Sequence, residues 1–313
     1  MKVLIAIYPF LNNIAEINGV EFVANPWGRD PFAEEIAEEM KLGKYDGLIV
    51  GTKNVSNSIM EHDPNLKVIS RVGVGFNNID VEYFKKHGVT TTYTPFGPTD
   101  STAEMALALI MTGTRRLRNY DNEIRSGFWK REFGLRLKDA KVAIVGFGRI
   151  GKRLAMLLQP FGCEILLHDI APDLATANAM KWQFINKEQV LQEADVISFH
   201  LPLKSDTRDW LSYNELAKLN RRVTVVNTAR GGIVNEAAIY DYLKGNPGSY
   251  YCCDVFEQEP YTGKLIELEN TMLTPHASSF TVGSRRQTEL LAIDNCLKIL
   301  FDQPCDNIVE RNE

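Results

Sequence analysis

The stretch Lys141-Val142-Ala143-Ile144-Val145-Gly146-Phe147-Gly148-Arg149-Ile150-Gly151 decides the fold. Its apolar first half reads as a buried strand, and the glycine-rich turn that follows opens an amphipathic helix carrying Leu154 and Leu158. Glycines permit a tight turn and a close approach of the backbone to a ligand, and the N-terminus of a helix attracts phosphate. This order of strand, turn and helix is typical of a dinucleotide-binding βα unit.

An acidic residue, Asp169, follows the next predicted strand, Glu164–His168, roughly 20 residues after the glycine-rich turn. A carboxylate at this place accepts hydrogen bonds from a ribose and repels a 2′-phosphate, and residues 168–172 contain no Arg or Lys. The sequence therefore predicts NAD rather than NADP, held by Gly146, Gly148, Arg149, Ile150, Gly151 and Asp169.

Short apolar runs alternate with amphipathic ones along most of the chain, which favours an α/β fold with parallel sheets. The first series of predicted strands is Val3–Tyr8, Gly47–Gly51, Lys67–Val72 and Val89–Tyr93, with helices at Pro31–Leu42 and Asp80–His87. The turn residues of Thr94–Pro98 indicate a linker. The second series is Lys141–Val145, Glu164–His168, Asp195–His200, Val223–Asn227, Tyr250–Asp254 and Met272–Thr274, followed by a helix over Thr281–Phe301.

A long helix is expected directly after the linker, with Thr99, Asp100 or Ser101 as its N-cap. Its positions from Ala103 to Met111 are apolar nearly all round. Such a helix needs several neighbours, so it belongs either between domains, at a subunit contact, or in an ordinary core.

Composition excludes several classes of protein. The chain has 313 residues, which favours two domains, and Lys plus Arg number 35 against 40 for Asp plus Glu. The net charge of −5 argues against a nucleic-acid partner, and no apolar run is long enough for a membrane span. The N-terminus reads as a strand, not as a signal peptide. Five cysteines without a CxxC pair favour a reducing, cytoplasmic compartment, and the histidines show no metal-ligand spacing, so we expect no metal.

Chemistry-bearing residues follow the strands of the second series. Arg230 follows one strand in a glycine-flanked turn, Glu259 follows the next, and His276 follows the last. A guanidinium suits a carboxylate, and a histidine beside a carboxylate suits acid–base chemistry near neutral pH. Each residue alone also has a structural explanation, as a surface arginine or a packed histidine. The hypothesis of a site depends on the three occurring together at the carboxyl ends of parallel strands.

The sequence resembles the NAD-dependent D-2-hydroxyacid dehydrogenases over nearly the whole chain. The residues that carry the resemblance are Arg71–Asp80, the glycine-rich turn, His200–Leu203, Asn227–Gly231, Asp254–Pro260 and Thr274–His276. The resemblance implies two Rossmann-like domains: a flavodoxin-like substrate domain, 1–98 and 281–313, and an inserted NAD-binding domain, 99–280. It also implies a homodimer, with the helix after Thr99 taking part in the contact.

The resemblance further implies a role for each matching residue. Arg230 binds the substrate, His276 is the acid–base and Glu259 orients it. Asp254 contacts the nicotinamide carboxamide, while Thr102, His200, Pro202, Thr207, Thr228 and Ala229 lie near the cofactor. The N–H groups of Val74 and Gly75 hold the substrate carboxylate. Two departures from the family pattern put the fit of the substrate in question: Asn77 stands for a frequent Asp, and Ala277-Ser278-Ser279 follow His276 where glycine is frequent.

The expected activity is hydride transfer between NAD(H) and a small D-2-hydroxy or 2-oxo acid. Around Arg71 the resemblance is to phosphoglycerate dehydrogenases, in which a basic residue there meets a phosphate, and Lys53 could add a second charge. Both residues are alternatively solvated surface cations. The competing readings are therefore 3-phosphoglycerate with 3-phosphohydroxypyruvate, a glyoxylate or hydroxypyruvate reductase, and, in another class, an NAD-sensing binding protein or corepressor.

Overall fold

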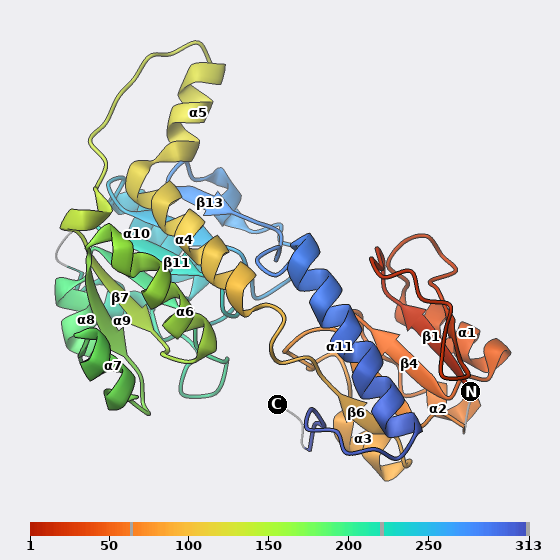
Figure 1. Cartoon of the computed structure of the whole chain (residues 1–313). Coiled ribbons are helices and arrows are strands. Elements are labelled where there is room, and N and C mark those ends of the chain that lie inside the picture. The colour runs from red at the N-terminus through yellow and green to blue at the C-terminus, as the bar shows by residue number, and fades with distance from the viewer. Residues whose placement is uncertain (63–64, 220–221, 311–313) are drawn as a thin grey trace. The chain divides into compact units, whose positions relative to one another are not determined.

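The computed structural model describes residues 1–62, 65–219 and 222–310, and the chain divides into two compact units (Figure 1). Unit 1 consists of Met1–Pro98 and Phe280–Glu313, and unit 2 of Thr99–Ser279. Within the predicted substrate-domain segment 281–313, residues 311–313 lie outside the described part of the chain.

The strands of unit 1 form one sheet in the order β2-β3-β1-β4-β5-β6. They are β1 (Lys2–Ala6), β2 (Glu16–Ile17), β3 (Val20–Val23), β4 (Gly47–Val50), β5 (Val68–Arg71) and β6 (Thr90–Thr92), and the helices are α1 (Ala33–Gly43), α2 (Ile59–His62), α3 (Val81–Lys86) and α11 (Val282–Leu300). The described neighbours pair in parallel except for β2 with β3. Apart from the β2 edge, this is the flavodoxin-like order, whose switch point lies between β1 and β4.

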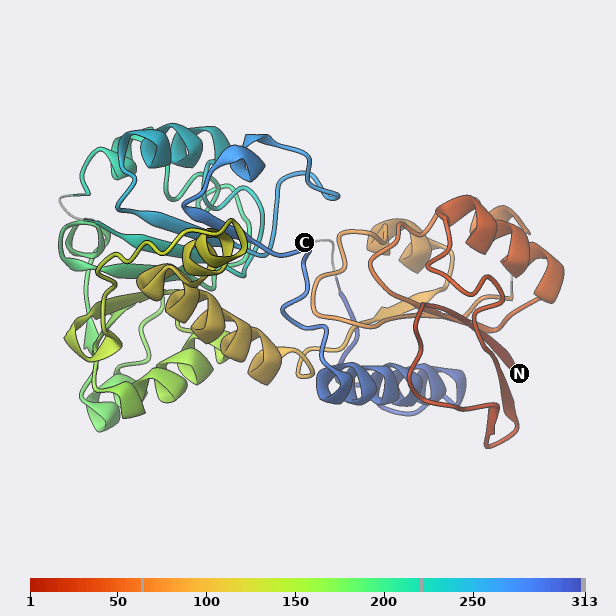
Figure 2. The same ribbon diagram turned by 90° about the horizontal axis from the view of Figure 1, so that it is seen from above.

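Both faces of the sheet are buried at its central strands, which explains the apolar runs of β1 and β4. Leu4 and Ala6 point to one face and pack with Ile36 of α1, while Val3 and Ile5 point to the other face and pack with Ile293 of α11. Figure 2 shows α11 and α1 on opposite sides of the strands. The final helix therefore completes a sheet that begins at the N-terminus.

Unit 2 contains a sheet in the order β13-β12-β11-β10-β7-β8-β9, with parallel pairing. Its strands are β7 (Lys141–Val145), β8 (Glu164–His168), β9 (Gln183–Phe184), β10 (Val196–Phe199), β11 (Thr224–Asn227), β12 (Tyr250–Cys253) and β13 (Thr271–Leu273). Its helices are α4 (Thr99–Arg115), α5 (Leu117–Arg125), α6 (Arg149–Leu158), α7 (Leu174–Met180), α8 (Lys187–Glu193), α9 (Tyr213–Leu216) and α10 (Glu236–Gly245). Three short 3₁₀ helices span Leu137–Asp139, Gln159–Phe161 and Lys264–Glu267.

This strand order is that of a Rossmann fold, with the switch point between β7 and β10. Helices cover both faces of the sheet: α4 and α6 lie side by side on one, and α8 and α10 pack on the other. The predicted α/β class with two parallel, Rossmann-like sheets and a flavodoxin-like first unit is confirmed.

The helix after the linker differs from its prediction at the N-terminus. It begins at Thr99, so the expected caps Thr99, Asp100 and Ser101 lie inside its first turn. Asp100 instead forms an ion pair with Arg153 of α6, 2.6 Å between oxygen and nitrogen, and a carboxylate in a first turn also favours the helix dipole. Ala103, Ala106, Leu109 and Ile110 of α4 are buried in a hydrophobic cluster of unit 2, as in a core helix. A contact of α4 with a second subunit stays a prediction.

The prediction missed the short strands β2, β3 and β9. The run Val20–Val23 is short and contains a glutamate, so its alternation alone does not distinguish it from a loop. In the structure β3 pairs in parallel with β1, and this contact stabilises it as a strand. Among the described residues, we find no helix that combines the length and apolar character needed to cross a membrane.

Candidate active site

The candidate active site lies at the carboxyl edge of the unit 2 sheet. Because the strands are parallel, the residues that follow β11, β12 and β13 emerge at the same edge. Arg230 follows β11, Glu259 follows β12 and His276 follows β13. The three residues therefore come from three neighbouring strands, although they are far apart in the sequence.

His276 and Glu259 are in direct contact. The imidazole Nδ1 lies 2.8 Å from Oε2 of Glu259, and both side chains are partly exposed, at 41% and 37%. The N–H of Phe256 donates to Oε1 of the same carboxylate. This arrangement holds the ring by Nδ1 and leaves Nε2 as the nitrogen that can exchange a proton with a ligand.

The electrostatics of the pair favour the charged carboxylate. Burial opposes ionisation of Glu259, but the hydrogen bonds from His276 and from the Phe256 N–H outweigh it, with help from the positive charge of Arg230. The pKa of Glu259 consequently lies below its ordinary value. An ionised Glu259 stabilises an imidazolium at His276, as an acid–base role requires.

The backbone at His276 adopts the left-handed conformation, with φ at +51°, which costs about 1 kcal/mol or more for a residue with a side chain. Asp254 compensates for this cost. Its carbonyl accepts the N–H of His276, and its fully buried carboxylate accepts from Thr274, Ala277 and Ser278. Asp254 thus fixes the loop that carries His276, a role that its place in the sequence did not reveal.

Arg230 is positioned by its own tight turn. The amide of Asn227 donates to the Arg230 carbonyl and its oxygen accepts the Ala229 N–H, while the guanidinium donates to the Ala229 carbonyl at 2.8 Å. Gly231 packs so closely on Phe256 that a Cβ there would overlap the Phe256 backbone. This contact holds the turn of Arg230 against the loop of Glu259. Asn227 was not predicted as a site residue, since a buried asparagine at a strand end also occurs as ordinary turn chemistry.

The glycine-rich turn forms a cradle between β7 and α6. Gly146 has φ at +98°, and a Cβ on it would stand 2.6 Å from the carbonyl oxygen of His200. A Cβ on Gly151 would overlap the Gly146 carbonyl, so the helix can begin this close to the strand only with glycine. By contrast, Gly148 faces open space. An open glycine at the start of a helix is what a pyrophosphate needs.

Asp169 stands beside this turn, at the end of β8. Its carboxylate accepts the N–H of Phe147, at 2.6 Å, and the N–H of Ala171, at 2.8 Å. The residue therefore joins the turn to the strand end, and a carboxylate has lone pairs left for two ribose hydroxyls.

Two buried polar atoms at this edge have no hydrogen-bond partner among the described residues: Nδ1 of His200 and Oγ1 of Thr228. They follow β10 and β11, on the far side of the switch point from the glycine-rich turn. Burial lowers the pKa of His200 to about 3, so its ring is neutral and bound through Nε2 to Ser198. Because unpaired buried polar atoms are costly, the cradle and these two atoms together fit a dinucleotide.

The remaining predicted cofactor residues occupy several places in unit 2. Thr102 is buried in the first turn of α4. Thr207 accepts the Lys204 N–H and donates to the Pro202 carbonyl, so it shapes the loop after β10. Ala229 lies in the turn of Arg230. Their contacts with a cofactor, and that of Asp254 with a carboxamide, stay predictions.

The predicted substrate residues belong to unit 1. Val74 and Gly75 follow β5, and within the described part of the chain their N–H groups donate to no acceptor. The guanidinium of Arg71 donates to the Val72 carbonyl and lies against Gly73 of its own loop. Lys53 is exposed on the loop after β4, and its carbonyl accepts from Asn78. Free N–H groups suit an anion, whereas Arg71 is directed into its own loop.

Comparison with known proteins supports the same assignment. Residues 107–278 match the model of the D-isomer specific 2-hydroxyacid dehydrogenase NAD-binding domain. The chain is 32% identical to a glyoxylate reductase of Thermococcus litoralis, over 87% of this chain and 86% of that protein. It is 29% identical to a D-3-phosphoglycerate dehydrogenase of Archaeoglobus fulgidus, over 88% of this chain and 53% of that protein.

A D-lactate dehydrogenase of Treponema pallidum superposes with a TM-score of 0.86 at 25% identity, over 99% of both chains. The family model and these relatives agree with the cradle, with its two unpaired polar atoms, and with the contact between His276 and Glu259. The chain therefore belongs to the D-isomer specific 2-hydroxyacid dehydrogenases and is an NAD-dependent oxidoreductase of 2-hydroxy acids.

Proposed function

We propose that the enzyme reduces a small 2-oxo acid of the glyoxylate or hydroxypyruvate type to the corresponding 2-hydroxy acid, with Arg230, His276 and Glu259 as its catalytic groups. The observation that carries the assignment of roles is the 2.8 Å contact between Nδ1 of His276 and Glu259. It directs the second ring nitrogen away from the carboxylate and makes it available to the substrate.

In the proposed reaction the Arg230 guanidinium binds the substrate and polarises its 2-oxo group. His276 donates the proton from Nε2 to that oxygen, and Glu259 stabilises the imidazolium beforehand. NADH, when bound, supplies the hydride that C2 accepts. The carbonyl thereby gains one hydride and one proton, and in the oxidative direction His276 takes the proton back.

The proposed substrate class draws on the relatives and on unit 1. A glyoxylate reductase aligns with most of its own length, whereas the phosphoglycerate dehydrogenase aligns with about half of its length. The free N–H groups of Val74 and Gly75 suit the one carboxylate that all these acids share. For 3-phosphohydroxypyruvate, the alternative, Arg71 would have to leave the carbonyl of Val72 to meet the phosphate.

The direct test is a substrate panel followed by the absorbance of NADH. We expect turnover of glyoxylate and hydroxypyruvate at rates well above those of pyruvate and 2-ketoglutarate. The fifth compound of the panel is 3-phosphohydroxypyruvate, the substrate of the alternative reading. Tight binding of NADH without turnover of any of the five would contradict an enzymatic function. That result would favour the NAD-sensing alternative.

We also propose a homodimer in the cytoplasm. Large apolar side chains are exposed on the segment after α5, with Phe128 at 64%, Trp129 at 81% and Phe133 at 101%. An exposed apolar cluster of this kind is typical of a subunit contact. All five cysteines are free, as in a reducing compartment. Light scattering should give twice the chain mass for the wild type, and a smaller mass for Trp129→Glu.

A further inference from the structure

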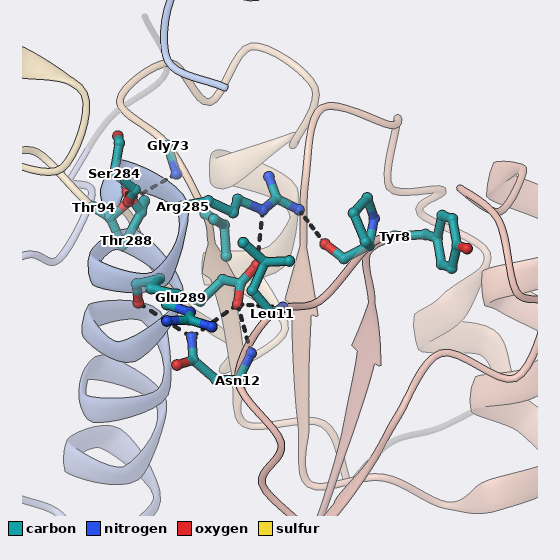
Figure 3. A network of polar contacts seen from close by, with 12 residues as sticks. Tyr8, Leu11, Asn12, Gly73, Thr94, Ser284, Arg285, Thr288 and Glu289 are labelled. Atoms are coloured by element: carbon teal, nitrogen blue, oxygen red, sulfur yellow. Dashed lines mark hydrogen bonds and ion pairs between the residues drawn. The ribbon is translucent and has the colours of Figure 1, made fainter. Parts of the chain in front are cut away.

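The loops at the carboxyl edge of unit 1 are tied to the first turns of α11 by a polar network, shown in Figure 3. Its centre is Glu289, whose side chain is completely buried. The carboxylate accepts the N–H groups of Leu11 and Asn12, at 2.9 and 3.2 Å, and the Asn12 side-chain amide at 2.9 Å. The loop after β1 is therefore held directly by a residue near the other end of the chain.

Arg285, one turn earlier on α11, is the counter-ion of Glu289. Its Nε lies 2.8 Å from Oε1 of Glu289, and its Nη2 donates to the Pro9 carbonyl at 3.3 Å. The guanidinium also lies over the ring of Phe280, 5.5 Å from the centroid. A carboxylate buried without a positive partner would be strongly unfavourable, so the pair forms one neutral unit.

The position of this pair matters because of the strand order. In a sheet of flavodoxin-like order, ligands bind at the carboxyl ends of the strands on either side of the switch point, here β1 and β4. Pro9, Leu11 and Asn12 belong to the loop that follows β1. Arg285, which reaches this loop, therefore lies where an anionic group of a substrate would bind. Its positive charge is already neutralised by Glu289.

We propose that Glu289 is a specificity-determining residue that cancels the charge of Arg285 at the switch point of unit 1. The site accordingly takes 2-oxo acids whose only charge is the carboxylate and discriminates against a phosphorylated one. This inference rests on the proposed function, because it concerns which 2-oxo acid the enzyme reduces. The competing explanation is that the buried pair serves only to attach α11 to the sheet.

The test compares substrate preference in four proteins. Glu289→Gln keeps one acceptor oxygen for the loop N–H groups and leaves Arg285 without its counter-charge. The double variant Arg285→Gln with Glu289→Gln removes both charges. Asp294→Asn is the matched control, because Asp294 and Lys298 form the same i, i+4 ion pair on the exposed side of α11. Each variant and the wild type are assayed with hydroxypyruvate and with 3-phosphohydroxypyruvate.

In the wild type we expect kcat/KM to be higher for hydroxypyruvate than for its phosphorylated form. Glu289→Gln should shift the ratio toward the phosphorylated substrate by about tenfold, and the double variant should return it to the wild-type value. Asp294→Asn should leave it unchanged. A merely structural pair would lower both activities together and leave the ratio constant. That outcome, or a wild type that prefers the phosphorylated substrate, would overturn the proposal.

A second measurement does not depend on turnover or on the folding of one variant. Inorganic phosphate in the millimolar range should raise the melting temperature of Glu289→Gln but not that of the wild type, the double variant or Asp294→Asn. Stabilisation of the wild type by phosphate would contradict the proposal, whether or not Glu289→Gln folds. If no 2-oxo acid is reduced, the proposed function fails. The comparison of melting temperatures with phosphate still tests whether Glu289 cancels the charge of Arg285.

Discussion

At the scale of single residues, the site is built from ordinary side chains in uncommon surroundings. His276 is held in a left-handed backbone conformation by Asp254 and is oriented by Glu259. Arg230 is held by a turn that Asn227 closes. The proposed chemistry depends on this small set of groups, whose geometry is fixed before a ligand arrives, so we expect the largest effects of substitution at these residues.

Replacement of Arg230 or His276 by alanine should abolish turnover while NADH binding is retained. Loss of the substrate clamp or of the proton donor should each lower kcat/KM on the order of 10³-fold or more. The measurements are steady-state rates and NADH fluorescence titration. His87→Ala is the control, because His87 is exposed in unit 1 and its Nδ1 lies 2.8 Å from the Tyr83 carbonyl oxygen. A rate within tenfold of wild type in either variant would refute its role.

His200 should make the fold sensitive to acid. In the native state its pKa is about 3, against 6.5 for an ordinary histidine, so between these values the unfolded chain binds the extra proton. With respect to His200, the free energy of unfolding is therefore highest above about pH 6.5, and it falls as the pH decreases toward 3. Between about pH 7.5 and pH 5 this residue should account for about 2 kcal/mol.

The measurement is urea unfolding at the two pH values. His200→Gln, which stays neutral, should lose less free energy of unfolding than the wild type over this interval. Equal losses in both proteins would show that the ring of His200 is not kept neutral by the fold.

At the scale of elements, the turns after the strands determine what the site can hold. Two glycines illustrate the difference between a residue that packs against another loop and a residue that leaves space for a ligand. Gly231 lies against the backbone of Phe256, and Gly148 faces open space at the start of α6 with φ at −75°. A methyl group at these two positions should therefore have different consequences.

Gly231→Ala should destabilise the protein by about 2 kcal/mol and lower kcat, because the turn of Arg230 must move away from the loop of Glu259. Gly148→Ala should fold normally and raise the KM for NADH, because its methyl group occupies the space left for the pyrophosphate. Gly245→Ala, at an open position in α10, is the control and should leave both properties intact. Identical behaviour of Gly148→Ala and Gly245→Ala would argue against the cradle.

The sequence predicted most strands of unit 2 because their interiors are largely apolar. The predicted strand Lys141–Val145 coincides with β7, and Glu164–His168 coincides with β8. The first residue of a helix and the short edge strands were harder to predict. Asp100 in the first turn of α4 pairs with Arg153, and β3 pairs with β1. Both are contacts between segments that are distant in the sequence.

For the site, the sequence identified Glu259 and His276, whose contact the structure confirms, because their residue types and their places after strands are local information. It did not identify the anchoring role of Asp254 or the network of Glu289. Both depend on tertiary hydrogen bonds, from Ala277 and Ser278 in one case and from Leu11 and Asn12 in the other. Such contacts have no sequence periodicity to reveal them.

At the scale of the whole molecule, the two units differ in whether one or two segments of the chain form them. Unit 2 is continuous, from Thr99 to Ser279, and both of its hydrophobic clusters consist of its own residues. Unit 1 is discontinuous, and one face of its sheet is covered by α11. The units should therefore respond differently when the chain is cut.

A fragment of residues 99–279 should fold cooperatively and bind NADH without reducing any 2-oxo acid. A fragment of residues 1–98 should remain unfolded or aggregate, because Val3, Ile5, Ile49 and Val68 lose the cover of α11. Circular dichroism melting and NADH fluorescence test both statements. A stable, monomeric 1–98 fragment would show that α11 is dispensable for unit 1.

The origin of unit 1 from both ends of the chain has a consequence for biosynthesis. The first strands leave the ribosome before unit 2, but the helix that shields them ends at Leu300 and is made only after unit 2. During most of translation, one side of that nascent sheet stays uncovered while the intervening unit can already mature. Chaperones that recognise apolar surface should therefore engage this polypeptide through its earliest segment until synthesis has passed residue 300.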